Sequence, residues 1–380
     1  MSMIERLRYS LEATDGLARA GVIETRRGKI HTPVFMPVGT QGTVKALSRE
    51  ELQVSGAEII LGNTYHLYLR PGLKVMETFG GLHRFAAWDR PILTDSGGYQ
   101  FFSLSHLAKF SDEGVRFRSH HDGSRHVFTP ERVIEVQRAI GSDIMMVLDQ
   151  CPALPATRWT LDEAVNRSTA WAERSLRVVR EGDGALFAIS QGGTDIARRL
   201  GHIERLSEMQ HEGRGFDGIA LGGLAVGESP SEMYDTIEAC APTMPSDRPR
   251  YLMGVGRPID LLEAIGRGVD MFDCVMPTRN ARNGQVFTSS GKLNMRNARF
   301  GTEDAPVDGL CSCSTCRTYS RGYVSHLIRA KEALGIRLTS IHNVHYYLSL
   351  VRGAREAIIN GMFDAYKARA MSGWAAGENS

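Results

Sequence analysis

The sequence has neither a long apolar run nor an export signal. Its N-terminus mixes Glu5, Arg6, Arg8 and Glu12 with apolar residues, whereas a signal peptide carries an uninterrupted apolar segment. The same charges exclude a membrane span there, since a span needs about 20 predominantly apolar residues. Low-complexity segments and repeats of about 20 to 50 residues are also absent. We therefore expect a cytoplasmic protein with no membrane partner.

The net charge is small but unevenly distributed. The whole chain carries +2, yet residues 1–278 hold 31 Lys and Arg against 36 Asp and Glu, and residues 279–370 hold 14 against 6. An acidic body is thus followed by a basic segment. Two interpretations stay open: the basic segment is an ordinary solvated surface, or it binds a phosphate backbone, where clustered cations release counterions.

What the chain does contain is apolar material and glycine. With 42% hydrophobic residues and 40 glycines among 380 residues, we expect a globular protein with a large core and many tight turns. The length fits a single α/β barrel with an insertion, a class that often exceeds about 250 residues. Two independent domains would also fit but are not required.

Short apolar segments ending in Gly, Asp or Asn recur at the spacing of a strand plus a helix, which is typical of βα units. Amphipathic stretches at Pro130–Ile140 and 161–179 are predicted helices, the first with Thr129 as its N-cap. Polar, glycine-rich signatures follow the predicted strands around the whole set, which favours a (β/α)8 TIM barrel over a doubly wound sheet. The eight predicted strands are 33–38, 58–61, 91–93, 143–148, 186–189, 218–220, 251–253 and 269–272.

Three of the six cysteines are clustered near the C-terminus. Cys311, Cys313 and Cys316 form a Cys-x-Cys-x2-Cys motif, and 25 residues separate Cys316 from His342. Three thiolates and one imidazole make the closed tetrahedral set of a structural zinc site, so we predict one structural Zn²⁺ per chain. Disulfides are not expected in a chain without an export signal.

The cysteines of this motif are firmer candidates than the histidine. Free thiols beside an unrelated histidine are the alternative to a metal site. Three other side chains compete with His342 as the fourth ligand: Asn343, His345 and His326. The remaining cysteines are predicted to be small buried residues: Cys151, Cys240 and Cys274.

The rhythm of strands and helices is interrupted after residue 278, where the cysteine cluster lies. Before the first barrel strand, hairpin-like runs at 9–12 and 21–25 are predicted to close the bottom of the barrel. We therefore divide the chain into a barrel at 1–278, a zinc-binding insertion at 279–344 and a C-terminal segment at 345–380. The helix of this last segment is predicted to return to the barrel as a displaced eighth helix.

Two aspartates stand at the ends of predicted strands. Asp95 lies in Thr-Asp-Ser-Gly-Gly-Tyr-Gln after the third strand, and Asp273 lies in Asp-Met-Phe-Asp-Cys after the eighth. In isolation such an Asp is usually a helix cap or an ion-pair partner. Two carboxylates across one site, however, suit substitution at an anomeric carbon, where one attacks C1′ of a ribose and the other transfers protons on the base.

Other groups on the same rim suit the binding of a flat heterocycle. Asp149, Gln191 and the Gly222-Gly223 backbone can pair with the polar edge of a purine-like ring. Tyr99 and Met253 provide flat apolar surfaces for stacking. We therefore predict a purine-base pocket at the carboxyl end of the barrel.

These motifs resemble those of bacterial-type tRNA-guanine transglycosylases, also called queuine tRNA-ribosyltransferases. The resemblance extends from about Tyr9 to Arg369 with the motifs in the expected order. The matching segments are Thr94-Asp-Ser-Gly-Gly-Tyr-Gln100, Gly222-Gly-Leu-Ala-Val-Gly227, Tyr251-Leu-Met-Gly-Val-Gly256, Asp270-Met-Phe-Asp-Cys274, Pro277-Thr-Arg279 and the set Cys311, Cys313, Cys316 and His342.

The resemblance implies a role for each matching residue. Asp273 corresponds to the family's nucleophile and Asp95 to its general acid/base. Arg279 and Arg282 correspond to residues that contact the nucleotides flanking the target guanine. The groups that read the base correspond to Asp149, Gln191, Gly223 and Leu224, and those that sandwich it to Tyr99 and Met253.

The family's activity is then what we expect here. It exchanges guanine at wobble position 34, in the anticodon loop of tRNAs with a U-G-U sequence, for a 7-deazaguanine, in queuosine biosynthesis. Flipping a base out of a loop costs little and leaves the loop phosphates to a basic surface. The resemblance also implies a homodimer.

Two residues favour preQ1 (7-aminomethyl-7-deazaguanine) as the incoming base. Eukaryotic enzymes that use queuine resemble this chain but have glycine at Val226, whereas bacterial preQ1 enzymes have Val226 and Cys151. Archaeal enzymes carry additional C-terminal domains, and the end of this chain near its last predicted helix fits them poorly. One residue departs from the family: Gln150 stands where a glutamate is usual, and that glutamate is thought to support the peptide between Leu224 and Ala225.

Two alternatives remain at this stage. The same fold could take queuine or another 7-deazaguanine in place of preQ1. The chain could also be a non-catalytic tRNA-binding subunit, but such a subunit need not retain both Asp95 and Asp273.

Overall fold

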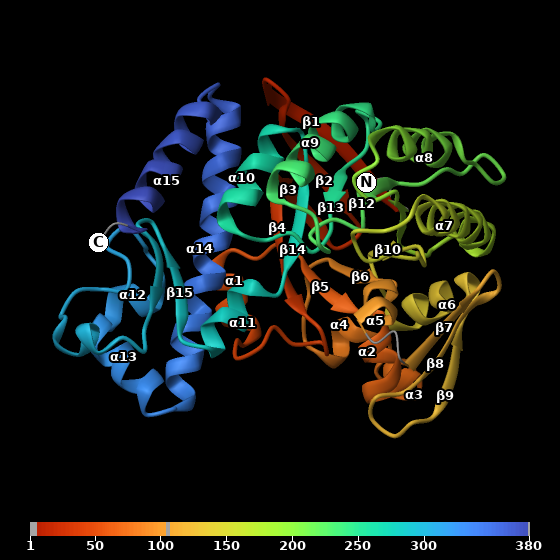
Figure 1. Cartoon of the computed structure of the whole chain (residues 1–380). Coiled ribbons are helices and arrows are strands. Elements are labelled where there is room, and N and C mark those ends of the chain that lie inside the picture. Colours follow the sequence, from red (N-terminus) through yellow and green to blue (C-terminus); the bar gives the residue numbers. More distant parts are fainter. Residues whose placement is uncertain (1–5, 104–106, 379–380) are drawn as a thin grey trace.

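A closed barrel of eight parallel strands forms the centre of the computed structural model, which describes residues 6–103 and 107–378 (Figure 1). Its strands follow one another around the barrel in chain order, and the last pairs with the first. They are β4 (Val34–Gly39), β5 (Ile60–Asn63), β6 (Ile92–Asp95), β10 (Ile144–Met146), β11 (Ala185–Ser190), β12 (Gly218–Leu221), β13 (Arg250–Leu252) and β14 (Met271–Cys274). The predicted fold and all eight predicted strands are confirmed.

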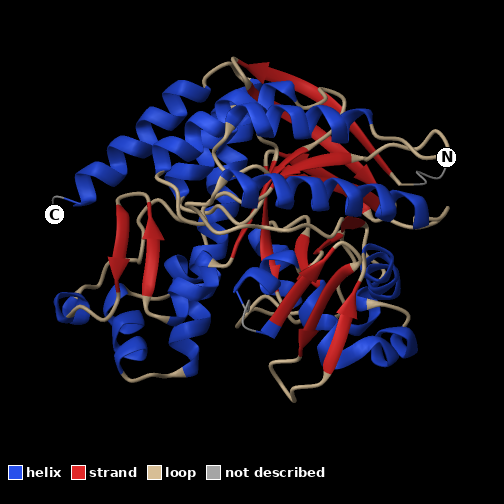
Figure 2. Ribbon diagram, turned by 45° about the vertical axis from the view of Figure 1, so that its right-hand side comes forward, coloured by secondary structure: helices blue, strands red, loops and turns tan. Residues whose placement is uncertain are grey.

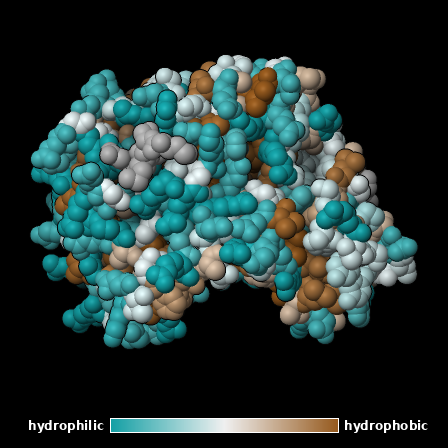
Figure 3. Space-filling view, turned by 180° about the vertical axis from the view of Figure 1, so that it is seen from behind, coloured by the Kyte–Doolittle hydropathy of each residue, from teal (hydrophilic) through white to brown (hydrophobic). Residues whose placement is uncertain are grey.

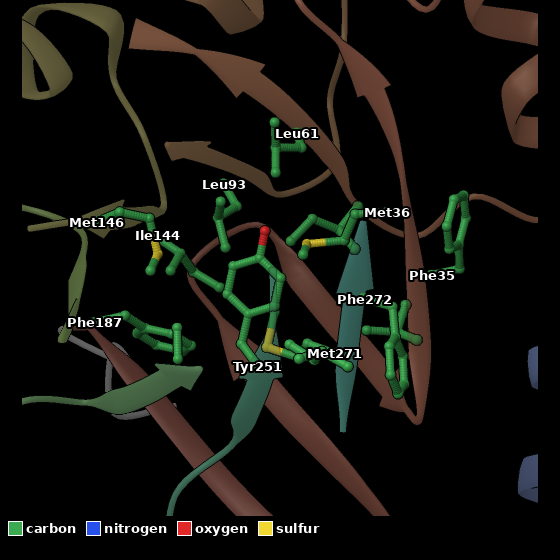
Figure 4. Close-up of a cluster of buried hydrophobic side chains, with 14 of the residues drawn as sticks. Phe35, Met36, Leu61, Leu93, Ile144, Met146, Phe187, Tyr251, Met271 and Phe272 are labelled. Atoms are coloured by element: carbon green, nitrogen blue, oxygen red, sulfur yellow. The ribbon is translucent and has the colours of Figure 1, made fainter. Parts of the chain in front are cut away.

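The strands are apolar on both faces because side chains fill the barrel and helices cover it. Leu61, Leu93 and Tyr251 point into the interior, whereas Phe35 lies on the outside (Figure 4). The ring centroid of Phe35 is 5.0 Å from that of Tyr347, which lies on a helix outside the barrel. The barrel is therefore a packed core, and its rim is left to the polar ends of the strands.

Helices surround the barrel in the order expected for βα units. The predicted helix Pro130–Ile140 is confirmed as α6, and Thr129 caps it by accepting a hydrogen bond from the Arg132 N–H. No helix in the described ranges is long and apolar enough to cross a membrane. The remaining helices before the cysteine cluster are α1 (Arg49–Ser55), α2 (Thr64–Leu67), α3 (Leu73–Phe79), α4 (Leu82–Phe85), α5 (Gly98–Ser103), α7 (Arg158–Val178), α8 (Ile196–Glu208), α9 (Pro230–Cys240), α10 (Pro258–Gly266) and α11 (Met276–Arg282), with a π-turn at Tyr68–Gly72 and a 3-10 turn at Ala241–Thr243.

Helix α14 (Ala333–Ile359) packs against β4, α1 and α10 and so takes the place of the eighth barrel helix. It is followed by α15 (Phe363–Glu378), after a break at Gly361, whose φ is +65°. The division we predicted at 344/345 falls inside α14. The helix is continuous there because one part of it contributes to the cysteine-rich subdomain and the rest covers the barrel.

An antiparallel sheet of β1 (Leu7–Asp15), β2 (Ala18–Thr25) and β3 (Gly28–Thr32) lies against the ends at which the barrel strands begin. Arg26 Nε lies 3.0 Å from Oδ1 of Asp143, which precedes β10. Arg19 Nε lies 3.4 Å from Oδ1 of Asp270, which precedes β14. These ion pairs hold the sheet at the end where the strands begin, so the sheet does not cover the opposite, carboxyl end of the barrel.

A second antiparallel sheet, inserted between β6 and α6, escaped sequence analysis. It consists of β7 (Ala108–Ser111), β8 (Gly114–Arg118) and β9 (Arg125–Phe128) and forms a lobe beside the barrel (Figure 2). Each strand has only four or five residues. Runs this short do not establish a period of two against the charged residues around them.

The cysteine-rich subdomain has its own small core. Its elements are a hairpin of β15 (Gln285–Thr288) and β16 (Gly291–Asn294), a 3-10 turn (Ala298–Thr302), α12 (Ser314–Thr318) and α13 (Arg321–Arg329). Phe300, Val324 and Leu327 pack there with Cys313 and Cys316. The subdomain and the β7–β9 lobe lie on opposite sides of the barrel's open end (Figure 1).

Candidate active site and metal centre

Asp273 is held in one orientation at the end of β14. Its Oδ1 accepts hydrogen bonds from the Tyr251 hydroxyl at 2.6 Å and from the Gly254 N–H at 2.8 Å. Within residues 6–103 and 107–378 no group donates to Oδ2. Burial raises the pKa of Asp273, although both hydrogen bonds lower it. The result is an oriented carboxylate with one oxygen available to a reacting atom.

Asp95, at the end of β6, has a different environment. Its Oδ2 accepts from the Asn63 amide at 2.5 Å, and its Oδ1 accepts from the Thr64 N–H at 3.1 Å. Burial and then the negative charge of Asp273 raise the pKa of Asp95 to about 7. A carboxyl group with this pKa can both give and take a proton near neutral pH.

Asp149 and Gln191, which follow the neighbouring strands β10 and β11, form a hydrogen-bonded pair. The Gln191 amide donates to Asp149 Oδ2 at 2.6 Å, and burial raises the pKa of Asp149 to about 6. Gln191 Oε1 is buried and has no partner among the described residues. A Cβ at Gly98 would stand 2.3 Å from Asp149 Oδ1, so only glycine fits beside this carboxylate. Buried polar atoms are normally satisfied, and an unpaired one at a rim is suited to a ligand.

The Gly222-Gly223 segment lies directly against Gln191. A Cβ on Gly223 would stand 2.3 Å from Gln191 Oε1, and φ at Gly223 is +62°, which favours glycine. Leu224, the next residue, is buried at 3% exposure. The backbone at Gly222 and Gly223 is thus packed directly against Gln191, the partner of Asp149.

The peptide after Leu224 is supported by Glu228. Its carboxylate accepts from the Ala225 N–H and, at 3.1 Å, from the Val226 N–H. Gln150 instead accepts from Arg167, and its own N–H donates to Ser168 Oγ at 3.0 Å. Gln150, which stands where the family usually has a glutamate, is thus turned toward α7, and Glu228 supports this peptide instead.

Tyr99 and Met253 lie at the rim, after different barrel strands. Tyr99 is the second residue of α5 and is largely exposed, while Met253 follows β13 and is partly buried. Arg279 and Arg282 lie on α11, directly after the strand that carries Asp273. Their guanidinium groups form no ion pair within the described ranges. The structure thus leaves two cations unneutralised next to the site.

Cys311, Cys313, Cys316 and His342 converge on one point in the subdomain. Their ligand atoms all lie within 4.8 Å of one another. His342 Nδ1 is 3.7 Å from Cys313 Sγ and 3.2 Å from Cys316 Sγ, near the edges of about 3.8 Å of a tetrahedral zinc-thiolate site. The cluster can hold a metal ion.

Of the four candidates for the fourth ligand, His342 is the one whose ring nitrogen lies with the three thiols, and its surroundings explain why. His342 Nε2 donates to the Phe287 carbonyl at 2.7 Å, which leaves Nδ1 unprotonated and directed at the thiols. Asn343 is occupied by the Phe287 N–H, while His345 contacts Ser312 Oγ at 3.3 Å. His326 is exposed on α13. The other three cysteines are buried, as expected.

Comparison with known proteins agrees with this geometry. The chain matches the family model described as "Queuine tRNA-ribosyltransferase" over residues 14–376. The chain belongs to the queuine tRNA-ribosyltransferase family. Across 363 residues it is 53% identical to the queuine tRNA-ribosyltransferase of Oleidesulfovibrio alaskensis, covering 95% of each chain. Its identity to that of Ruegeria pomeroyi is 50% over 377 residues, with 99% of each chain covered. The resemblance inferred from the motifs is confirmed, and the protein is a pentosyltransferase.

Several residues of this queuine tRNA-ribosyltransferase site escaped sequence analysis. Arg199 is completely buried on α8 and donates to the carbonyls of Gly193, Ser190, Gly222 and Gly223 at 2.5 to 3.3 Å. It therefore ties the loops after β11 and β12 together. Arg199 lies on the buried face of α8 with Ile203 and Leu206, so the amphipathic pattern of this helix could have identified it as a buried arginine.

Proposed function

We propose that the enzyme exchanges guanine at wobble position 34 of tRNAs with a U-G-U sequence for preQ1, in queuosine biosynthesis. The observation that carries this proposal is the arrangement of two aspartates with different surroundings. Asp273 is oriented with Oδ2 available, and Asp95, whose pKa is about 7, is close enough to be influenced by its charge. Names of the relatives support a tRNA substrate and a base related to queuine.

In the proposed mechanism Asp273 attacks C1′ of the ribose, and the bond from C1′ to guanine breaks. Asp95 gives its proton to the leaving guanine, so that the base departs neutral. The incoming base then attacks C1′, the bond to Asp273 breaks, and Asp95 takes the proton that this base loses. Two inversions restore the original β-linkage.

The pocket that reads the base consists of Asp149, Gln191 and the backbone at Gly223 and Leu224. Asp149 accepts from ring and amino N–H groups, while the unpaired Gln191 Oε1 gives the pocket a second acceptor. Gly223 contributes its N–H. Tyr99 and Met253 sandwich the ring from its two faces.

Arg279 and Arg282 bind the nucleotides on either side of the target. Both follow the strand that carries Asp273, and neither guanidinium forms an ion pair within the described ranges. Guanidinium groups suit phosphate and base edges because of their planar fork of donors. The proposal includes a homodimer, on the family's precedent alone.

The metal of the Cys311, Cys313, Cys316 and His342 cluster is proposed to be Zn²⁺ in a structural role. Four protein ligands leave no open position for chemistry, and two of the cysteines belong to the subdomain's core. We expect Cys316→Ser to lose most of the bound zinc, measured by elemental analysis, and to unfold the subdomain at a lower temperature than the wild type.

Chelation of the metal is expected to weaken tRNA binding by about tenfold or more, since metal-binding energy is folding energy in such small units. Cys240→Ser, at a buried cysteine outside the cluster, is the matched control and should keep its zinc. Unchanged folding and tRNA affinity after complete metal removal would contradict a structural role.

Incorporation of labelled guanine into tRNA tests the proposed function directly. We expect the wild-type protein to incorporate guanine into a tRNA with a U-G-U anticodon and not into one in which that guanine is replaced. An inactive wild type, with folding and metal content verified, would sink the proposal. It would favour instead the non-catalytic tRNA-binding subunit.

The choice of preQ1 rests on Val226 and Cys151, and Val226 stands next to the peptide supported by Glu228. Replacing Val226 by Gly removes a branched side chain at the pocket and should admit a bulkier base. We expect V226G to gain about tenfold or more in kcat/KM for queuine, with little change for preQ1. A wild type that already prefers queuine would contradict the assignment of preQ1 while leaving the reaction intact.

A further inference from the structure

The β7–β9 sheet has no part in the function described so far. Its inner face carries Val115, Phe117 and Phe128, which are buried. Phe117 and Phe128 pack on Phe101 with ring centroids 5.0 and 5.8 Å away. The sheet is therefore firmly attached to the barrel, and its outer face is presented outward.

That outer face carries four exposed cations. Lys109 on β7 is paired in register with Arg116 on β8, and Arg118 on β8 is paired with Arg125 on β9. Like charges directly opposite each other on one face of a sheet are destabilising. Such an arrangement is a cost to the fold unless an anion occupies the face.

Carboxylates of the protein neutralise little of this charge. Arg116 lies 3.9 Å from Glu113, but both side chains are more than 70% exposed, so the interaction is weak. Throughout the part of the chain that the structure describes, Lys109, Arg118 and Arg125 form no ion pair. The four cations line a hollow of about 970 Å³ on the sheet.

One end of this sheet lies beside the catalytic rim. In the turn between β8 and β9, His120 accepts or donates a 2.9 Å hydrogen bond with the Tyr65 hydroxyl, and its ring is 5.6 Å from that of His66. Tyr65 and His66 belong to α2, which begins directly after Asn63, the residue that donates to Asp95. The turn between β8 and β9 therefore contacts the helix that directly follows a hydrogen-bond partner of Asp95.

The other end of the sheet lies against α7. The turn between β7 and β8 is tied to α7, where Arg167 Nη2 lies 3.1 Å from Asp112 Oδ1 and Trp171 donates to the Asp112 carbonyl. The pair Arg118 and Arg125 therefore adjoins the turn that contacts α2, and Lys109 and Arg116 continue the same line toward α7. At about 3.3 Å per residue, the two pairs are about 7 Å apart.

We infer that the outer face of β7–β9 binds the phosphate backbone of the tRNA whose anticodon loop occupies the active site. This inference rests on the proposed function. The face lies on the opposite side of the barrel's open end from the cysteine-rich subdomain and from α11, the helix that carries Arg279 and Arg282. The surface is indented between the two lobes (Figures 1 and 3). A target base held between the lobes leaves phosphates on both sides of it, and a line of cations on each side matches them.

The test uses two charge-removing double variants of the full-length protein. These are Arg118→Ala with Arg125→Ala, and Lys109→Ala with Arg116→Ala. The matched control removes Arg8 and Lys29, two exposed cations on the sheet at the other end of the barrel. The probe is a transcribed tRNA with a U-G-U anticodon, whose Kd is measured between low and high salt.

Each test variant should lower the slope of log Kd against log salt by about 1.5 and weaken binding roughly tenfold at 0.1 M salt. We expect kcat at saturating tRNA to stay unchanged and the melting temperature not to fall, because each double variant removes a pair of opposed like charges. The control should bind tRNA as the wild type does. Restoring charge with Arg118→Lys and Arg125→Lys should recover the slope.

The inference and the proposed function can fail separately. A wild type that exchanges guanine, with both double variants matching its Kd and salt slope, overturns the tRNA contact of β7–β9 alone. An equal loss of slope in the control also overturns it, because the effect would then be one of net charge. A wild type that binds tRNA but exchanges no guanine overturns the proposed reaction alone.

Discussion

Replacing Asp273 by Asn is expected to reduce guanine exchange by at least about 10,000-fold, the scale seen when an enzyme loses its nucleophile. The amide still offers Oδ1 to the Tyr251 hydroxyl and the Gly254 N–H, so the local structure should persist. What is lost is the anionic oxygen that forms the bond to C1′. The measurement is the initial rate of labelled guanine incorporation into tRNA.

Tyr251→Phe is the matched comparison, since it removes one hydrogen bond to Asp273 and leaves the carboxylate. We expect a loss of about 10- to 100-fold, in line with one charge-assisted hydrogen bond. Both variants should bind tRNA with the wild-type Kd. Asp273→Asn retaining more than about a hundredth of the wild-type rate would mean that another group is the nucleophile.

Replacing Asp95 by Asn is expected to lower the rate by about 100- to 10,000-fold, because an amide can neither give nor take the base's proton. The pH profile carries more information than the rate. Since the pKa of Asp95 is about 7, formation of the covalent adduct in a single turnover should decline above pH 7, as Asp95 loses the proton it must donate. The residual activity of Asp95→Asn should not show this decline above pH 7.

The same substitution should stabilise the protein at high pH. In the folded protein the pKa of Asp95 is about 7, against 3.8 for an ordinary aspartate, so between these values the native state keeps a proton that the unfolded state has lost. Stability is therefore full below pH 3.8 and declines as pH rises to 7. The upper limit of this loss is about 4 kcal/mol, and the partial exposure of Asp95 makes it smaller.

Urea unfolding at pH 4 and pH 8 checks this second effect. We expect Asp95→Asn to match the wild type at pH 4 and to exceed it at pH 8. Asn63→Ala is a useful comparison, because it removes a hydrogen bond that lowers the pKa of Asp95 and so should shift the decline in adduct formation to higher pH. An Asn variant whose stability gain is the same at both pH values would contradict the raised pKa.

The barrel was predictable from sequence because its strands are buried on both faces and end in polar, glycine-rich turns. The predicted ends of the eight barrel strands lie within two residues of the observed ends. The β7–β9 sheet was not predictable in the same way. Its strands have only four or five residues each, and only β8 alternates apolar and charged residues clearly; the aromatic packing against Phe101 is visible only in the structure.

The chemistry-bearing residues were predictable where the motif itself places them at a strand end. Asp149 and Gln191 are distant in sequence, yet they meet because β10 and β11 are neighbours. Arg199 and Glu228 were not singled out, because their role is to hold backbone groups of loops. The partners of a backbone N–H or carbonyl depend on tertiary geometry that no local pattern encodes.

The account's central claim is a covalent link between Asp273 and tRNA from which guanine has been released. The most direct measurement traps that complex by denaturation before the second step, digests it, and locates the modified peptide by mass spectrometry. The account predicts a ribose-linked adduct on the peptide containing Asp273, one equivalent of free guanine, and release of the adduct when preQ1 is supplied. Exchange of guanine with no adduct, or with the adduct on a peptide lacking Asp273, would contradict it.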